Sequence, residues 1–180
     1  MARVGVLALQ GAFEAQVEVL RRLNHDVVEV RSAEALEGID GLVFPGGEST
    51  TQLKLMAWGE MLSALHGFVA SGRPVLGTCA GLILAAREVL PGPQESLDWI
   101  DVTVQRNGYG RQLDSFEARS DGGRTLMFIR APRITRVGPG VEVLDTLDGE
   151  PVLVRQGKVV GTAFHPELSD DVDIFRELFV

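Results

Sequence analysis

Short runs dominated by apolar residues alternate with amphipathic stretches over the first 90 residues. The apolar runs, at 4–9, 27–30, 40–44 and 74–76, are typical of strands buried in a sheet. Between them, apolar residues recur at helical spacing at 13–23, 53–56 and 61–69. This alternation predicts a parallel sheet with helices on both faces and a catalytic crevice at the carboxyl ends of its strands.

Strand signals predominate after about residue 90. They lie at 102–104, 114–119, 126–129, 152–154 and 159–164, with a hairpin signal at Gln156-Gly157 and a short helix expected at 172–179. We therefore predict an α/β fold of three layers, flavodoxin-like, in one domain spanning residues 1–180. Its central sheet should be mostly parallel, with a strand-rich mixed or antiparallel extension of the same sheet.

Composition and charge exclude several classes of protein. A chain of 180 residues, 45% of them hydrophobic, is long enough for one compact domain with a sizeable core. Its net charge of −8 argues against nucleic-acid or anionic-membrane binding, because both need a basic field. The three histidines are scattered without ligand spacing, so we expect no metal and no other cofactor.

The compartment is predicted from the same features. No run approaches the roughly 20 apolar residues that span a bilayer. The amino-terminal residues lead directly into strand-like sequence rather than a signal peptide. One cysteine cannot form an internal disulfide, which suits a reducing environment. We expect a cytoplasmic protein.

The one cysteine lies in Gly77-Thr78-Cys79-Ala80-Gly81, between a strand signal and a helix signal. This G-x-nucleophile-x-G pattern predicts a sharp elbow with a strained central residue. We expect the thiol to stand exposed at the helix amino terminus, where unpaired N–H groups favour the thiolate. A lone cysteine is more often a small buried hydrophobe. The elbow pattern favours a nucleophile instead.

A cysteine nucleophile needs a base and a group that orients the base. His165 follows the last predicted strand, and Glu167 lies two residues further on, with Pro166 between them. We expect both side chains at the rim of the crevice, with the carboxylate holding the imidazole toward the thiol. The same pair could instead be a surface histidine beside a surface glutamate.

Acyl transfer also needs donors for a developing oxyanion. The glycine-rich turn Pro45-Gly46-Gly47 lets the backbone approach a substrate closely. We expect the N–H of Gly47 to be one donor. The N–H of Ala80, directly after the predicted nucleophile, should be the other.

Three motifs in this order, at 45–49, 77–81 and 164–168, resemble those of the class I (triad-type) glutamine amidotransferases. Further motifs resemble the glutaminase subunits of pyridoxal 5′-phosphate synthase: Leu9-Gln10-Gly11, 46–51, 77–83, Gln105-Arg106-Asn107, Gly110-Arg111-Gln112, 114–117 and 128–132. The resemblance covers nearly the whole chain. The sequence departs from this family at Ala15-Gln16, where Glu-His is usual, which bears on any partner contact that the histidine makes.

The resemblance implies hydrolysis of L-glutamine to L-glutamate and ammonia by a triad of Cys79, His165 and Glu167. It also implies a set of glutamine contacts: Gly47, Glu48, Ser49, Arg106, Ile129 and Arg130. A guanidinium can hold the glutamine α-carboxylate with two parallel hydrogen bonds. Either Arg106 or Arg130 could do so.

A chain of 180 residues has no room for an ammonia-accepting synthase as well, so we expect a protein partner. The resemblance identifies it as the pyridoxal 5′-phosphate synthase subunit of a hetero-oligomer in vitamin B6 biosynthesis. Gln10, at the end of the first predicted strand, is the expected relay of that partner's contact to the Gly46–Gly47 peptide. Two alternatives stay open: a glutaminase of another synthase, such as imidazole glycerol phosphate synthase, and a non-catalytic binding subunit.

Overall fold

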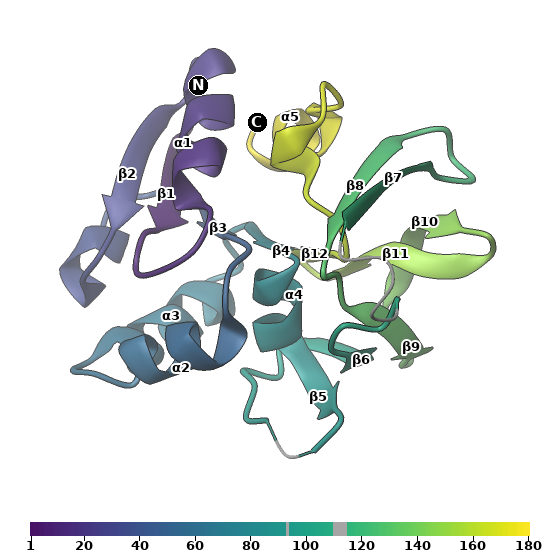
Figure 1. The fold of residues 1–180 in the computed structure, drawn as a ribbon. Coiled ribbons are helices and arrows are strands. Elements are labelled where there is room, and N and C mark those ends of the chain that lie inside the picture. The colour runs from purple at the N-terminus through teal and green to yellow at the C-terminus, as the bar shows by residue number, and fades with distance from the viewer. Residues whose placement is uncertain (93, 110–114) are drawn as a thin grey trace.

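The computed structural model describes residues 1–92, 94–109 and 115–180 (Figure 1). Its first half has the predicted alternation of strands and helices. The elements are β1 (Arg3–Leu7), α1 (Phe13–Arg22), β2 (Asp26–Val30), the 3₁₀ turn η1 (Ala33–Leu36), β3 (Gly41–Phe44), α2 (Ser49–Met56), α3 (Met61–Ala70), β4 (Val75–Thr78) and α4 (Ala80–Ala85).

The second half is rich in strands, as predicted. Its elements are β5 (Ala86–Leu90), β6 (Ile100–Gln105), β7 (Ser115–Arg119), β8 (Thr125–Ile129), β9 (Arg133–Val137), β10 (Glu142–Leu147), β11 (Glu150–Gln156), β12 (Val159–Thr162), the 3₁₀ turn η2 (Pro166–Leu168) and α5 (Asp173–Leu178). The Gly110-Arg111-Gln112 motif and Asp114, the first residue of one predicted strand, lie outside the described residues.

The central sheet has the strand order β10-β11-β12-β4-β3-β1-β2. Strands β2, β1, β3, β4 and β12 run parallel, whereas β11 and β10 continue the sheet in antiparallel pairing. The predicted mostly parallel sheet with an antiparallel extension is therefore confirmed, as is the β11–β12 hairpin.

Two groups of later strands do not extend this sheet. β5, β6 and β9 form a three-stranded sheet, and β7 and β8 form a separate pair. The expectation of one continuous extension is therefore wrong for these strands. No strand was predicted at β5, because its alanine, arginine, glutamate and leucine residues all favour helices. In the structure its backbone pairs with β6 instead.

Helices cover both faces of the central sheet. Figure 1 shows α1 and α5 on one side and α2, α3 and α4 on the other. Strands β3, β4 and β12 are buried along their whole length, which explains their continuous apolar sequences. Because the central strands run parallel, the segments that follow β1, β3, β4 and β12 meet at one edge of the sheet. The elbow cysteine and His165 both lie on these segments.

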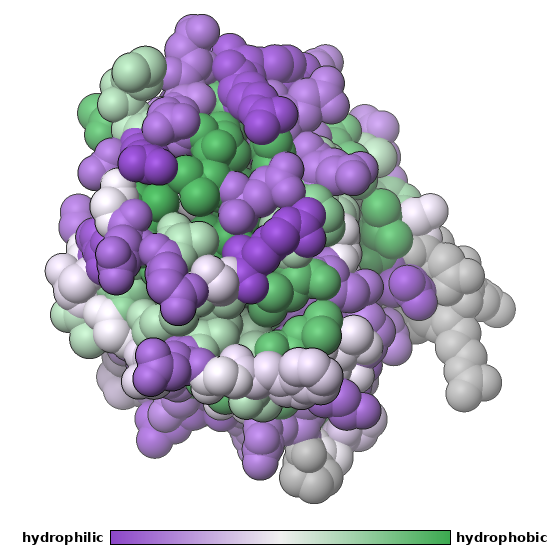
Figure 2. All heavy atoms as spheres, turned by 90° about the vertical axis from the view of Figure 1, so that its left-hand side faces the viewer, coloured by the Kyte–Doolittle hydropathy of each residue, from purple (hydrophilic) through white to green (hydrophobic). Residues whose placement is uncertain are grey.

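The outer surface is mostly polar where Figure 2 views it, from the side of β2 and η1. Hydrophilic residues surround separate apolar areas on this face. None of the helices in the described part of the chain is long and apolar enough to cross a membrane.

Candidate active site

Cys79 lies at a strained turn between β4 and α4, with φ 51° and ψ −100°. L-residues other than glycine rarely adopt a positive φ, and such strain collects at functional sites. The flanking glycines are required by close contacts. A Cβ on Gly77 would lie 2.8 Å from the carbonyl carbon of Gly81, and one on Gly81 would lie 2.3 Å from the Phe44 carbonyl oxygen. The structure thus has the predicted elbow.

The thiol was expected to stand exposed, but Cys79 is only 6% exposed. The carbonyl oxygen of Ile129 lies 3.8 Å from Sγ. The chain at Gly46 covers another side, since a Cβ there would lie 3.5 Å from the Cys79 Cβ. Both covering segments are distant in sequence from the elbow. A buried thiol alone would also suit a structural cysteine. The strained backbone of Cys79 and the imidazole near it distinguish it from one.

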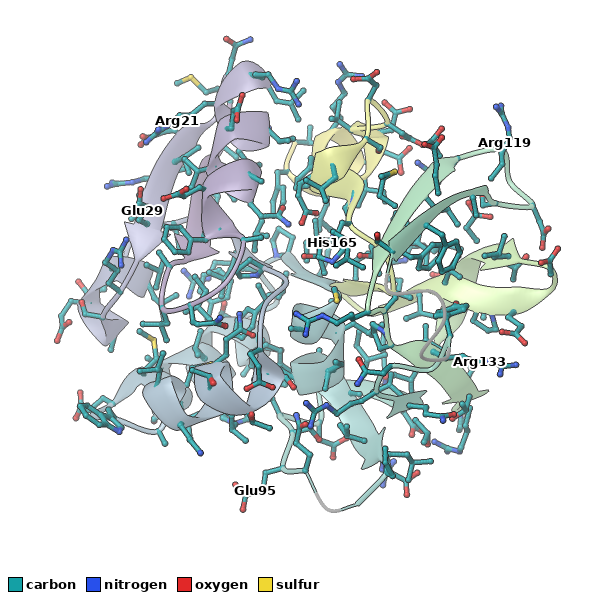
Figure 3. The ribbon with its side chains drawn as sticks, in the orientation of Figure 1. Arg21, Glu29, Glu95, Arg119, Arg133 and His165 are labelled. Atoms are coloured by element: carbon teal, nitrogen blue, oxygen red, sulfur yellow. The ribbon has the colours of Figure 1, made fainter. Side chains whose placement is uncertain are left out.

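His165 bonds Glu167 and lies beside the elbow of Cys79. Its Nδ1 lies 2.8 Å from the Glu167 Oε1. The ring and Cys79 adjoin the same turn, since a Cβ on Gly46 would lie 2.5 Å from the His165 Cε1 and 3.5 Å from the Cys79 Cβ. Because Nδ1 is taken by Glu167, Nε2 is the ring nitrogen left for the thiol. The backbone N–H of His165 donates to the Met127 carbonyl at 2.8 Å. Figure 3 shows His165 in the middle of the molecule, between α1 and the β7–β8 hairpin.

Glu167 was expected at the rim of the crevice, but its side chain is completely buried. The turn η2 begins at Pro166 and directs the carboxylate inward. Its second oxygen, Oε2, has no hydrogen-bond partner within the described part of the chain. Within the described residues, the buried carboxylate of Glu167 therefore has the His165 imidazole as its one hydrogen-bond partner.

The surroundings of His165 favour its charged form. Burial opposes the positive charge, but the hydrogen bond with Cys79, followed by the hydrogen bond and charge of Glu167, raises the pKa of His165 to about 10. A cationic imidazole beside Sγ stabilises a thiolate. A cysteine nucleophile with an adjacent base has this arrangement.

The glycine turn after β3 packs directly on this pair. A Cβ on Gly46 would lie 2.5 Å from the His165 Cε1, so only glycine fits there. The carbonyl oxygen of Gly46 accepts a hydrogen bond from the Ala12 N–H at 2.9 Å. The Gln10 side chain reaches the same turn, because its Oε1 accepts from the Glu48 N–H at 2.9 Å. Gln10 thus contacts the residue that follows Gly47.

Glu48 and Ser49 begin α2 beside this turn. Glu48 caps the helix, accepting from the Thr51 N–H at 3.0 Å. The hydrogen bond from the Thr50 hydroxyl, with those from Thr51, outweighs desolvation and lowers the pKa of Glu48 to about 2. Its Oε1 lies 3.2 Å from the Arg106 Nη2. Arg106, predicted from sequence as a glutamine contact, is therefore next to Glu48 in space.

The remaining predicted residues lie at the end of β8. Ile129, whose carbonyl faces Cys79, is 38% exposed. Arg130 follows it with a φ of 43°, and its side chain is exposed. This left-handed residue ends the strand next to the thiol. Arg130 therefore directly follows the strand that was predicted at 126–129.

Gln16 is a residue whose position the sequence interpretation did not foresee. Its side chain is completely buried and donates from Nε2 to the Thr78 hydroxyl at 3.1 Å, one residue before Cys79. Position 16 therefore faces the site from inside, and its side chain is not placed for a partner contact. A signal was present, since Gln16 lies three residues after Phe13 and four before Leu20 on the apolar face of α1.

The described residues contain no group of three or more His, Cys, Asp and Glu side chains that could hold a metal ion.

A solved structure titled "Crystal structure of glutamine amidotransferase" is 45% identical and covers 97% of this chain and 96% of its own, with a TM-score of 0.93. The structure of PurLQS from Thermotoga maritima, at 14% identity and a TM-score of 0.71 over 99% of this chain and 98% of its own, shows the fold alone.

Curated relatives are similar over nearly the whole chain. The pyridoxal 5′-phosphate synthase subunit PdxT of Corynebacterium jeikeium is 51% identical, over 98% of this chain and 94% of the relative. The protein of the same name from Koribacter versatilis is 50% identical, over 99% and 94%. The model of the SNO glutamine amidotransferase family matches residues 6–180. The chain therefore belongs to the SNO glutamine amidotransferase family.

Proposed function

We propose that this chain is the glutaminase subunit of a pyridoxal 5′-phosphate synthase and acts in the cytoplasm, hydrolysing L-glutamine and passing ammonia to a synthase subunit in a hetero-oligomer. The observation that carries the proposal is the imidazole of His165, whose Nδ1 is bonded to Glu167 and whose ring lies beside the elbow Cys79 at the Gly46 turn. Relatives with that subunit name, 45–51% identical, support this synthase over the imidazole glycerol phosphate one.

Cys79 is the proposed nucleophile. Its thiolate attacks the carboxamide carbon of glutamine, forming a C–S bond and a tetrahedral oxyanion. The His165 imidazolium gives its proton to the amide nitrogen, the C–N bond breaks, and ammonia leaves. A glutamyl thioester on Cys79 remains, and His165 is now neutral.

Water completes the reaction. Neutral His165 takes a proton from a water molecule as its oxygen attacks the thioester carbon. The second tetrahedral intermediate collapses, the C–S bond breaks, and Cys79 leaves as a thiolate beside the restored imidazolium. Glu167 stays ionised throughout and keeps Nδ1 protonated, so that Nε2 faces the reacting atoms.

The proposed oxyanion donors are the N–H groups of Gly47 and Ala80, as expected from the sequence. Losing one such donor costs about 10²–10³ in rate. We assign the glutamine side to Glu48, Ser49, Ile129 and the two arginines. Arg106 already contacts Glu48, and Arg130 lies beside the carbonyl that faces Sγ.

The orientation of the Gly46–Gly47 peptide is the proposed point of control by the synthase. Turning this peptide would break the hydrogen bond from Ala12 to Gly46, which is worth about 0.5–1.5 kcal/mol. A partner therefore needs only a small difference in contact energy between the two orientations to select one. Gln10 is bonded to the adjacent Glu48 N–H and is the proposed relay.

Ammonia release from glutamine tests the proposal, measured with this chain by itself and during titration with the pyridoxal 5′-phosphate synthase subunit. We expect the partner to raise turnover by about 10²–10³ if one donor is missing without it. Gln10→Ala should reduce this activation. Full activity without the partner, unchanged on titration, would refute the control step. No ammonia under either condition would refute the proposed function.

A further inference from the structure

The β7–β8 hairpin contacts the active site but stands apart from the central sheet. Among the described strands, β7 and β8 pair only with each other. Yet β8 supplies the Met127 carbonyl for the His165 N–H and the Ile129 carbonyl beside Cys79. The position of this hairpin therefore sets two contacts of the proposed triad.

Apolar packing holds the hairpin against the rest of the protein but does not fix its orientation. Phe116 and Phe128 stack with ring centroids 4.6 Å apart, and Phe128 meets Phe164 edge-on at 6.2 Å. Phe128 is buried. Because hydrophobic attraction is not directional, this packing resists lifting of the hairpin more than it resists a small slide or rotation.

A polar cluster at the turn of the hairpin supplies directional contacts. We call it the hairpin anchor: Ser120, Arg124, Asp145 and Asp171. Asp145 lies in β10 where the pairing with β11 is irregular, and its side chain is only 4% exposed. It accepts from the Ser120 hydroxyl at 2.7 Å and from the Gly122 N–H at 3.0 Å. These bonds tie the hairpin turn to the edge of the central sheet.

Arg124 connects this cluster to the loop of the catalytic carboxylate. Its Nε lies 3.6 Å from the Asp145 Oδ2, and its Nη1 lies 3.2 Å from the Asp171 Oδ1. Arg124 directly precedes β8, and Asp171 lies four residues after Glu167. Figure 3 shows that Arg119, at the end of β7 near this turn, points away from His165. The ion pairs of Arg124 are with Asp145 and Asp171 and not with His165 or Glu167, so any effect on the site is indirect.

We propose that Arg124 is a positioning residue of the active site. By bonding Asp145 and Asp171 together, it fixes β8 relative to the segment that carries His165 and Glu167. The turnover that it supports is the glutamine hydrolysis proposed above. A misplacement of about 1 Å at a reacting group can cost about 10²-fold in rate, so a small shift of β8 is enough to matter.

Arg124→Met tests this proposal because it keeps the apolar stem and removes both ion pairs. Asp145 keeps three donors in this variant, those of Ser120 and Gly122 and the Thr146 N–H at 2.9 Å, so its charge is not left without partners. The matched control is Arg155→Met, which removes the Arg155–Glu142 pair on the β10–β11 edge of the same sheet. Arg124→Lys can reach one partner and should restore part of the loss.

Two readouts separate positioning from folding. In complex with the synthase subunit, Arg124→Met should lower kcat/KM for glutamine by about 10–100-fold per folded chain, with Arg124→Lys in between and Arg155→Met unchanged. The pH profile of Cys79 alkylation by iodoacetamide should move to higher pH in Arg124→Met, because a displaced imidazole stabilises the thiolate less.

A kcat/KM and an alkylation profile equal to those of Arg155→Met would overturn the proposal. If Arg124→Met does not fold, Asp171→Asn removes only the Arg124–Asp171 pair. This variant should shift kcat/KM and the alkylation profile in the same direction but by less. No shift in either would also overturn the proposal. Alkylation needs no glutamine. It therefore still tests the anchor if wild-type protein releases no ammonia, a result that would count against the proposed function alone.

Discussion

Replacing Glu167 by glutamine tests the triad with the least change in shape. In the wild-type protein one carboxylate oxygen lies 2.8 Å from the His165 Nδ1, and the other has no partner among the described residues. A glutamine amide can turn either its oxygen or its NH₂ toward Nδ1. The NH₂ orientation forces the proton onto Nε2, and the imidazole then cannot take a proton on the side of Cys79.

The size of the effect follows from these two orientations. No described contact at the second oxygen favours one over the other, so the unproductive tautomer is populated. The change also removes the carboxylate charge, which raises the pKa of His165 in the wild-type protein. A carboxylate-to-amide change in a serine triad costs about 10⁴ in kcat. We expect about 10²–10³ here, because a thiolate forms more easily than an alkoxide.

The assay is ammonia release at saturating glutamine and synthase subunit. Folding should survive, since the change removes a buried carboxylate with one unpaired oxygen and adds no volume. The buried position of Glu167 matters for this expectation, because the sequence had placed its carboxylate at the rim of the crevice. Glu142→Gln is the control, as Glu142 is exposed on β10. Wild-type turnover in Glu167→Gln, with both proteins folded, would mean that the carboxylate is incidental.

Two further predictions follow from the packing and charge of the site. Gly46→Ala places a Cβ 2.5 Å from the His165 Cε1 and should lower the unfolding free energy by about 1–3 kcal/mol and abolish most of the turnover. The control Gly67→Ala adds a Cβ in open space within α3 and should raise the unfolding free energy by about 0.5–1 kcal/mol. Urea titrations that rank the two variants the other way would contradict the packing. His165 has a folded pKa of about 10 against an ordinary 6.5, so its contribution to stability is complete below pH 6.5 and is lost as the pH rises toward 10. Unfolding free energies should therefore fall more steeply over that range in wild type than in Cys79→Ala, and parallel curves would refute the pairing.

Local patterns predicted the elbow at Cys79 and the contact between His165 and Glu167. The elbow is encoded within five residues, because its two glycines and its cysteine lie on one turn. His165 and Glu167 are two residues apart, so their contact needs only the short turn η2. The order of strands and helices in the first half also follows from periodicity in each segment.

Features that depend on distant segments were missed. Cys79 is covered by Gly46 and β8, which approach it only in the folded chain, so an exposed thiol was expected. Most residues of β5 favour a helix, and its pairing with β6 outweighs that local preference. Asp145 looks in the sequence like one more surface carboxylate. Only the fold shows it buried against Ser120.

Covalent labelling by a glutamine analogue that carries a diazo-ketone tests whether Cys79 is the nucleophile. We expect one label per chain, located at Cys79 by peptide mapping, with ammonia release lost in proportion and L-glutamine protecting against both. Cys79→Ala should take up no label and release no ammonia in the presence of the synthase subunit. A label at another residue, or ammonia release that persists in Cys79→Ala, would show that Cys79 is not the nucleophile.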